Sequence, residues 1–343
     1  MKQIEFISSY KFATISNIIY SGVFTDEQIN DLNISNFDII EKNQDFKYIR
    51  VKEFELNENS IIFSRTEDIQ SLFYSLKNIN FKNITLITHQ SDINLSVKYT
   101  NKIPECINKW FSVNVSVNHN KLRSIPIGLA NYHPKNLNEK DFNLSNVSNL
   151  QFFKQKNIKS LIYLNFQKST NLKERDGLYE LFLNKDWAKL ELPKNDKKIY
   201  IENLKNINFT LTPHGNGRDT HRFWESLYSG SIPVVKEHIA YSYAKDLPVL
   251  FVKDYKEVTQ DKLIKFLNEN NENNFNLQKL DFNYWRSEIK GEEPDKSNTA
   301  ILKTNNFRFI IFDLNYKIKN RFNSNKKILI YYFRKVKLYL KSE

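Results

Sequence analysis

The sequence is poor in cysteine and in long apolar runs. Cys106 is the single cysteine among 343 residues, which excludes a disulfide scaffold and a cysteine-based zinc site. No apolar run reaches the roughly 18 residues that a membrane-spanning helix needs. The first residues also lack the charged and apolar regions of a signal peptide. We therefore expect a protein of the cytoplasm.

What the sequence does contain is material for a large core. It has 26 Phe and 18 Tyr, and 40% of its residues are hydrophobic, which excludes wholesale disorder. The length corresponds to about two domains. The net charge of +12 is uneven, because residues 317–343 hold nine Lys or Arg against one acid. The remaining chain is only mildly basic, which argues against nucleic acid as a partner.

The hydrophobic pattern predicts an α/β protein. Short apolar runs separated by amphipathic stretches indicate parallel sheets covered on both faces. Expected strands are Ile4–Ile7, Ser60–Ser64, Ile84–Thr88, Trp110–Val117, 160–166, 209–212, 232–235 and 249–252, with helices over 66–77, 172–185, 197–206, 220–228, 258–270 and 276–290. Two such halves joined by a linker would face each other across a cleft, where ligands of these sheets bind.

We expect four segments along the chain. Residues 1–140 form an N-terminal domain, 141–158 a linker, 159–315 a C-terminal domain, and 316–343 a basic tail. In the tail, residues 326–341 space their apolar side chains as on one face of a helix, with Lys and Arg mostly elsewhere. This pattern favours contact with an anionic membrane surface. The alternative is a terminal helix that packs back onto the first domain.

The most informative segment is Phe209–Val235, because it holds three of the seven glycines in the order strand, loop, helix, strand. Gly215 and Gly217 allow a ligand to approach the backbone closely. Asp219 is a candidate N-cap for a helix whose free N–H groups would bind an anion. Arg222 can contact a phosphate and Glu225 can accept hydrogen bonds from ribose hydroxyls. The alternative is an intrahelical salt bridge between Arg222 and Glu225.

This segment resembles the donor-site motif of exostosin-like glycosyltransferases, glycosyltransferase family 47. The matching pattern is F-x-L-x-P-x-G-x-G-x-D-T-x-R-x-W-E-S-L-x-x-G-x-I-P-V-V, closest to the branch of the ribitol xylosyltransferases and their microbial and viral relatives. Weaker similarities lie upstream, in 87–92, 109–114, 121–131, 163–166 and 173–175. Gln90 stands where that branch usually has Asn.

The resemblance implies a GT-B fold, in which two Rossmann-like domains face a cleft, and inverting stereochemistry. In such a fold the N-terminal domain, residues 1–140, would hold the acceptor, and the C-terminal domain, residues 159–315, would hold the donor. Residues carried over as donor ligands are Arg175, His214, Gly215, Asn216, Gly217, Asp219, His221, Arg222 and Glu225. Among them, Arg222 would contact the diphosphate, Glu225 the ribose, and Arg175 a second phosphate position. The N-terminal membrane anchor of the Golgi members is missing, which indicates a cytoplasmic microbial enzyme.

The sequence also predicts that no metal is required. No two aspartates are separated by one residue, so the D-x-D pair that often holds Mg²⁺ or Mn²⁺ is absent. The helix dipole and arginines would then neutralise the leaving group. Transfer needs a base for the acceptor hydroxyl, and the candidates are Asp92 and then His89, both at the end of strand Ile84–Thr88. The ordinary alternatives are a helix N-cap for Asp92 and a hydrogen-bonded strand-end residue for His89.

These observations favour a metal-independent glycosyltransferase with a nucleotide-sugar donor and no other cofactor. Its expected acceptor is a hydroxyl of a cell-surface glycan such as a capsule or lipopolysaccharide, possibly lipid-linked, reached from the inner face of the cell membrane. The alternative is a non-catalytic subunit of a glycan-assembly complex that binds carbohydrate or nucleotide. A third hypothesis is a basic surface-binding protein in which the α/β body is incidental.

Overall fold

The computed structural model describes residues 3–131, 136–154, 156, 160–193, 196–304, 311 and 318. The amphipathic segment expected over residues 326–341 lies outside this part of the chain. No helix within the described residues is long and apolar enough to cross a bilayer.

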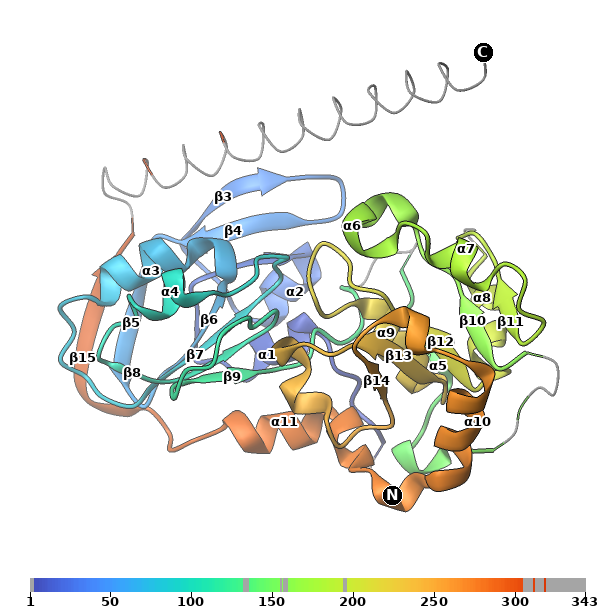
Figure 1. Ribbon diagram of the computed structural model, residues 1–343. Coiled ribbons are helices and arrows are strands. Elements are labelled where there is room, and N and C mark those ends of the chain that lie inside the picture. Colours follow the sequence, from blue (N-terminus) through green and yellow to red (C-terminus); the bar gives the residue numbers. More distant parts are fainter. Residues whose placement is uncertain are drawn as a thin grey trace, which may run out of the picture.

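Two five-stranded parallel sheets dominate the structure and lie side by side (Figure 1). The first has the order β1(Ile18–Ile19), β6(Ile61–Arg65), β7(Ile84–His89), β8(Ile107–Ser112), β9(Leu122–Ser124). The second has the order β11(Ala188–Leu190), β10(Ile162–Leu164), β12(Phe209–Leu211), β13(Ile232–Lys236), β14(Leu250–Val252). The fold is therefore α/β with parallel sheets, as the sequence predicts.

Two small antiparallel sheets flank the first parallel sheet. One has the order β2(Ser21–Phe24), β4(Lys47–Val51), β3(Phe37–Lys42), and the other pairs β15(Asp295–Lys303) with β5(Glu53–Glu58). The second pairing returns the chain from the second half to the first, with Ile301 opposite Glu55. These strands are absent from the sequence prediction. β3 is half-exposed, β15 is largely exposed, and both are rich in polar residues, whereas β2 and β4 are short, mostly buried and interrupted by Gly22 or by charged residues.

Helices cover the faces of the sheets. The α-helices are α1(Ser9–Thr14), α2(Asp26–Asp31), α3(Ile69–Leu76), α4(Val97–Thr100), α5(Glu139–Phe142), α6(Leu172–Arg175), α7(Leu178–Phe182), α8(Lys197–Lys205), α9(His221–Tyr228), α10(Gln260–Glu269) and α11(Phe282–Ile289). The 3₁₀ turns are η1(Thr66–Asp68), η2(Val147–Asn149), η3(Lys168–Thr170), η4(Ile239–Ala244), η5(Tyr255–Glu257), η6(Glu272–Asn274) and η7(Leu277–Leu280).

Three element predictions are wrong. Residues Ile4–Ile7 are irregular, and only the adjacent Ser8 makes a bridge, to Leu129. The helix expected over 172–185 is broken into α6 and α7, because Gly177 adopts a φ of +77°. The helix expected over 276–290 is divided at Asp281, whose extended backbone caps α11.

The two halves share one hydrophobic core. Side chains along β6 and β7 point alternately to the two faces of the first sheet. Ile62 and Leu86 pack with α3 on one face, whereas Phe63 and Ile87 belong to the core on the other face. This core continues through Phe209 and Ile232 of the second sheet. The segment 141–158, expected as a linker, contributes to it through buried side chains (Phe142, Leu150 and Phe152).

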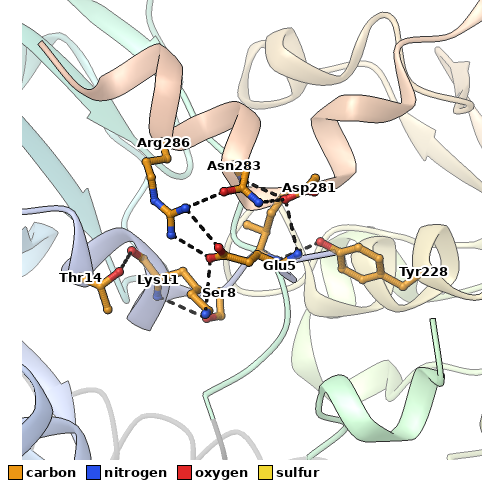
Figure 2. A network of polar contacts seen from close by, with 9 residues as sticks. Glu5, Ser8, Lys11, Thr14, Tyr228, Asp281, Asn283 and Arg286 are labelled. Carbon is orange, nitrogen blue, oxygen red and sulfur yellow. Dashed lines mark hydrogen bonds and ion pairs between the residues drawn. The ribbon is translucent and has the colours of Figure 1, made fainter. Parts of the chain in front are cut away.

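The first residues of the chain tie the two halves together (Figure 2). Glu5 accepts two hydrogen bonds from Arg286 of α11, at 3.1 and 2.8 Å. The N–H of Ile7 donates to the hydroxyl of Tyr228 at 3.0 Å, and Tyr228 lies at the end of α9. This connection fixes α9 relative to the first sheet.

Candidate functional site

The loop of residues 212–220 joins the carboxyl end of β12 to α9, and it is tightly packed. Gly215 and Gly217 are buried in it, and Asn216 is exposed. A Cβ at Gly217 would lie 2.7 Å from Nδ2 of Asn114, and one at Gly215 would lie 3.4 Å from Nη2 of Arg175. The glycines therefore allow the loop to touch both halves of the protein. Beyond α9, Gly230 has a φ of +69°, the left-handed conformation in which a glycine commonly ends a helix.

Asn114, at the end of β8, holds this loop from the first half. Its Oδ1 accepts hydrogen bonds from the N–H groups of Arg218 and Asp219, at 2.7 and 3.1 Å. Its Nδ2 donates to the carbonyl of Ser91 at 2.8 Å. The side chain is fully buried and the backbone φ is +54°, a conformation that Asn tolerates better than most residues. Sequence reasoning did not select Asn114 as a site residue, although the residue closes the upstream segment 109–114 that resembles the family.

Asp219 does not cap α9, which corrects the sequence prediction. The N-cap is Thr220, and its side chain makes no capping hydrogen bond. Asp219 is instead buried, and its Oδ2 accepts from the N–H of Ile127 at 2.8 Å and the hydroxyl of Tyr243 at 2.7 Å. Burial raises the pKa of Asp219 to about 6, although these donors favour the carboxylate. The residue thus links the loop to the segment after β9.

Arg175 supports the same loop from behind. Its guanidinium donates to the carbonyls of Pro213, His214 and Gln167 at distances of 2.8 to 3.1 Å. Burial, together with the neighbouring charge of Arg222, lowers the pKa of Arg175 to about 10. Two guanidinium groups are therefore close together at the loop, an arrangement that an anion would stabilise.

Arg222 and Glu225 lie on α9 on either side of a tyrosine that the sequence prediction missed. Tyr200 of α8 donates its hydroxyl to Oε2 of Glu225 at 2.8 Å, and the Arg222 guanidinium lies 5.9 Å from the Tyr200 ring centre. Within the described residues no ion pair joins Arg222 to Glu225, so the simple salt-bridge alternative is wrong. The Nε of Arg222 and the Oγ1 of Thr220 are buried without a hydrogen-bond partner. Both atoms lie at the N-terminal end of α9.

His214 belongs to the loop, and its side chain is buried as a neutral imidazole. It is 2% exposed, it stacks against Tyr241, and its Nδ1 is 3.2 Å from the guanidinium of Arg218. Burial first, and then the charges of Arg218 and His238, lower the pKa of His214 to about 3. At neutral pH His214 therefore offers a hydrogen bond, and not a positive charge, to any anion at the loop.

A cavity of about 500 Å³ opens beside this loop, at the carboxyl end of the first sheet. Asp92, Glu67 and Gln90 line it from the first half, and His221 of α9 lines it from the second. The structure therefore brings together Asp92 and the start of α9, which are about 130 residues apart in the sequence. We call this cavity the inter-sheet pocket.

Asp92 and His89 differ sharply in accessibility. Asp92 is exposed, and it does not cap a helix, because the next helix, α4, has Ser96 as its N-cap. His89 is 1% exposed, its Nδ1 accepts from the N–H of Gln90 at 2.8 Å, and its Nε2 donates to the carbonyl of Pro126 at 3.1 Å. Burial lowers the pKa of His89 to about 3. With both nitrogens occupied, His89 has no site for a substrate proton, so its ordinary strand-end role fits better than catalysis.

His221 presents one nitrogen to the inter-sheet pocket. Its Nδ1 donates to the carbonyl of Gly128 at 2.8 Å, which leaves Nε2 for a ligand. Across the pocket, Oε1 of Glu67 accepts from the hydroxyl of Ser91 at 3.0 Å, while its Oε2 is buried without a hydrogen-bond partner. Burial raises the pKa of Glu67, although Arg65 is close by. Sequence reasoning missed Glu67, since a lone acid after a strand carries no distinguishing signal.

Gln90 stands where the branch that the sequence resembles usually has Asn, and the structure shows how the longer side chain fits. Its φ is +55°, in the left-handed region where Asn is more favourable than Gln. The longer side chain reaches β2, where it accepts from the N–H of Val23 at 2.7 Å and donates to the carbonyl of Val23 at 2.9 Å. These two bonds imitate a strand pairing and offset the backbone cost.

The described residues contain no cluster of three or more His, Cys, Asp or Glu side chains arranged to hold a metal ion. The polar groups at the loop are instead arginines, backbone amides and hydroxyls. Such groups bind anions, as do the free N–H groups at the start of a helix.

Parallel α/β sheets with a glycine-containing loop between a strand end and a helix are typical of enzymes that bind nucleotides. Residues 171–303 match the family model described as RXYLT1 C-terminal domain. This family is that of a ribitol xylosyltransferase, an exostosin-like relative, so the match indicates a glycosyltransferase-type function. No match to a curated protein was found. The matched range contains the loop, α9 and β15, whereas Asp92 and Asn114 lie outside it.

Proposed function

We propose that this protein is a metal-independent, inverting glycosyltransferase of GT-B architecture that uses a nucleotide-sugar donor. The observation that carries the proposal is the loop 212–220 with α9, which lies within the matched family range and leaves Nε of Arg222 buried without a partner. A donor diphosphate at the start of α9 would supply the missing acceptor and would neutralise the two neighbouring arginines.

The donor nucleotide is placed by the same helix. Glu225, fixed by Tyr200, accepts hydrogen bonds from the ribose hydroxyls, while Arg222 and the first amides of α9 bind the diphosphate. Arg175 acts by holding the carbonyls of Pro213 and His214, so that the loop keeps the shape that the donor needs.

The acceptor occupies the inter-sheet pocket, and Asp92 is the base. Its exposed carboxylate removes the proton from an acceptor hydroxyl, whose oxygen forms a bond to the anomeric carbon of the donor sugar. The bond from that carbon to the diphosphate breaks, and its electron pair leaves with the nucleoside diphosphate. The positive end of α9, Arg222 and Arg175 stabilise the charge on this leaving group. The Nε2 of His221 accepts a hydrogen bond from the acceptor.

We further propose that the acceptor is a hydroxyl of a cell-surface glycan built at the inner face of the cell membrane. The basic composition of residues 317–343 supports this location, since clustered Lys and Arg bind anionic lipid. The proposal includes no cofactor other than the donor and no metal.

The test is thermal unfolding of the full chain with a panel of nucleotide sugars and nucleotides, with EDTA throughout. A ligand at 100 times its Kd should stabilise the protein by about 2.7 kcal/mol. We expect one donor to shift the melting temperature in the wild type and in Arg123→Ala, but not in Arg222→Ala. Arg123 is an exposed arginine on β9 that donates to the carbonyls of Asn120 and Leu122 and not to the loop, and it serves as the matched control.

The role of the base is tested by turnover. Asp92→Asn should lower kcat by at least about 100-fold and leave the donor-induced shift unchanged. A shift that needs Mg²⁺ would contradict the metal-independent mechanism, and the absence of any shift at millimolar ligand would contradict the donor site itself.

A further inference from the structure

A second cavity, of about 930 Å³, lies at the opposite edge of the first sheet from β1. Strands β8 and β9 and the loop of residues 117–121 form one wall, and η4 and α11 form the other. Figure 1 shows β9 close to α11 in this region. We call this cavity the edge groove. None of the residues that we assign to donor binding or to proton transfer lines it.

One wall of the edge groove carries three positive charges on the same face. Lys121 and Arg123 are two residues apart at β9. Arg123 pairs with Phe111 of β8, and Lys109 lies two residues before Phe111. Because side chains alternate between the faces of a strand, Lys109, Lys121 and Arg123 project together. The buried Trp110 projects to the other face.

No carboxylate neutralises these three cations within the described residues. The ammonium of Lys121 donates to the carbonyl of Glu105 at 3.4 Å, and the guanidinium of Arg123 donates to the carbonyls of Asn120 and Leu122. Lys279, on the opposite wall, differs because Asp246 pairs with it at 2.6 Å. Glu288 is the one acid among the described residues that line the groove. The wall formed by β8 and β9 is therefore open to an anion.

The wall formed by α11 carries two aromatic residues. Trp285 is 5% exposed, and its Nε1 donates to the carbonyl of Lys279. The half-buried Tyr284 ring packs edge-on against Trp285. Asn108, Asn118 and Asn120 add amide groups around the rim. Aromatic faces with amide groups suit sugar rings, and the cations suit acidic groups along the same chain.

The edge groove and the inter-sheet pocket lie along one short segment. Ser124 lines the groove, and Ile127, three residues further, lines the pocket. Three residues span at most about 10 Å, so the two cavities have lining residues within that distance of each other. The groove is concave, which excludes a flat lipid surface as its occupant.

We propose that the edge groove is a second binding site for the acceptor, and that it holds an acidic stretch of the glycan chain. The acidic groups are carboxylates or phosphodiesters along the chain, and they pair with Lys109, Lys121 and Arg123. The part of this inference that concerns the acceptor rests on the proposed function. Anion binding by the groove does not depend on it.

The experiment measures fluorescence anisotropy of labelled oligomers with the full chain at low salt and at 0.5 M NaCl. An oligogalacturonate carries carboxylates, a glycerol phosphate oligomer carries phosphodiesters, and a maltooligosaccharide is the neutral probe. We expect one acidic oligomer to bind with strong salt dependence, and the neutral one to bind at least about tenfold more weakly. The acidic oligomer that binds more tightly identifies the acidic group.

The key variant reverses the three cations (Lys109→Glu, Lys121→Glu, Arg123→Glu). Binding of the acidic oligomer should weaken at least about tenfold, since each exposed pair contributes a factor of a few. The control reverses three exposed lysines on and near α10, at the other end of the molecule (Lys253→Glu, Lys256→Glu, Lys265→Glu). If the control weakens binding equally, only net charge matters and the proposal is overturned. Glutamine in place of glutamate provides a milder variant if the reversed protein fails to fold.

Two further outcomes would overturn the proposal. One is an acidic oligomer that does not bind at millimolar concentration, and the other is a single-stranded oligonucleotide of equal charge that binds more tightly than either glycan. The donor-induced thermal shift, measured on the same variants, separates this inference from the proposed function. A retained shift with lost oligomer binding supports the groove, whereas oligomer binding without any donor shift refutes the proposed function alone.

Discussion

Removing the side chain of Asn114 should destabilise the protein, because this side chain holds the loop from the first half. Its amide satisfies two buried N–H groups, of Arg218 and Asp219, and one carbonyl, of Ser91. A buried group that loses its partner costs about 1–3 kcal/mol, and water can recover part of that. We therefore expect Asn114→Gly to destabilise the protein by about 3 kcal/mol, plus up to about 1 kcal/mol for the added chain entropy.

Glycine is the appropriate replacement because the backbone at Asn114 has a φ of +54°. Alanine would add about 1–2 kcal/mol of strain that has nothing to do with the hydrogen bonds. Asn114→Asp is the second variant, since its carboxylate still accepts from both N–H groups but cannot donate to Ser91. Its destabilisation should lie between those of the wild type and Asn114→Gly, and it should decrease at acidic pH, where the protonated acid regains a donor.

The assay is urea-induced unfolding followed by tryptophan fluorescence, together with the donor-induced thermal shift. We expect Asn114→Gly to lose the shift at subsaturating ligand, because the amides of Arg218 and Asp219 are no longer held. A loss of less than about 1 kcal/mol would equal the chain entropy alone. That result would refute the view that Asn114 clamps the loop.

Two further predictions concern the connections between the halves. Glu5→Gln should lose about 1 kcal/mol at neutral pH, because Arg286 lowers the pKa of Glu5 by hydrogen bonding. This contribution is present above the unfolded pKa near 4.5 and is lost as the pH falls through the lower folded pKa. The free energy of unfolding, measured with urea at a series of acidic pH values, should therefore decrease less steeply in the variant than in the wild type. Gly128→Ala should lose at least about 2 kcal/mol, since its φ is +69° and a Cβ would lie 2.2 Å from the carbonyl oxygen of Ile7. Gly177→Ala is the matched control, with a φ of +77° but no atom within 4 Å, and thermal unfolding should show it losing only about 1 kcal/mol. Equal losses in the two glycine variants would contradict the close approach at Gly128.

The parts of the fold that could be predicted are those where sequence neighbours decide the structure. The parallel strands β6, β7, β12 and β13 are rich in apolar and β-branched residues and are buried almost throughout, because both of their faces are covered. In contrast, β3 has the sequence FDIIEK and is half-exposed at an edge, so its pattern does not differ from that of a loop. The break between α6 and α7 depends on one glycine that sequence periodicity tolerates.

The site divides in the same way. The loop glycines, Arg222 and Glu225 are close in sequence and follow a strand, so their proximity could be predicted. Tyr200 could not, since its bond to Glu225 joins α8 to α9 across the sheet edge. Asp219 does not reach the amides of α9 because its carboxylate already accepts three hydrogen bonds, from the N–H of Ile127, the hydroxyl of Tyr243 and the indole N–H of Trp224. Sequence spacing does not reveal these contacts.

The loop in the second half takes its shape from residues of the first. Asn114 holds the amides of Arg218 and Asp219, the N–H of Ile127 binds Asp219, and the carbonyl of Gly128 orients His221. Each contact comes from a residue that follows β8 or β9, outside the matched range 171–303. A change in how the two sheets are placed would therefore alter the loop 212–220 and the inter-sheet pocket together. In the function that we propose, this coupling has a physical reason, since a donor at the loop and an acceptor in the pocket must meet at a fixed distance for transfer to proceed.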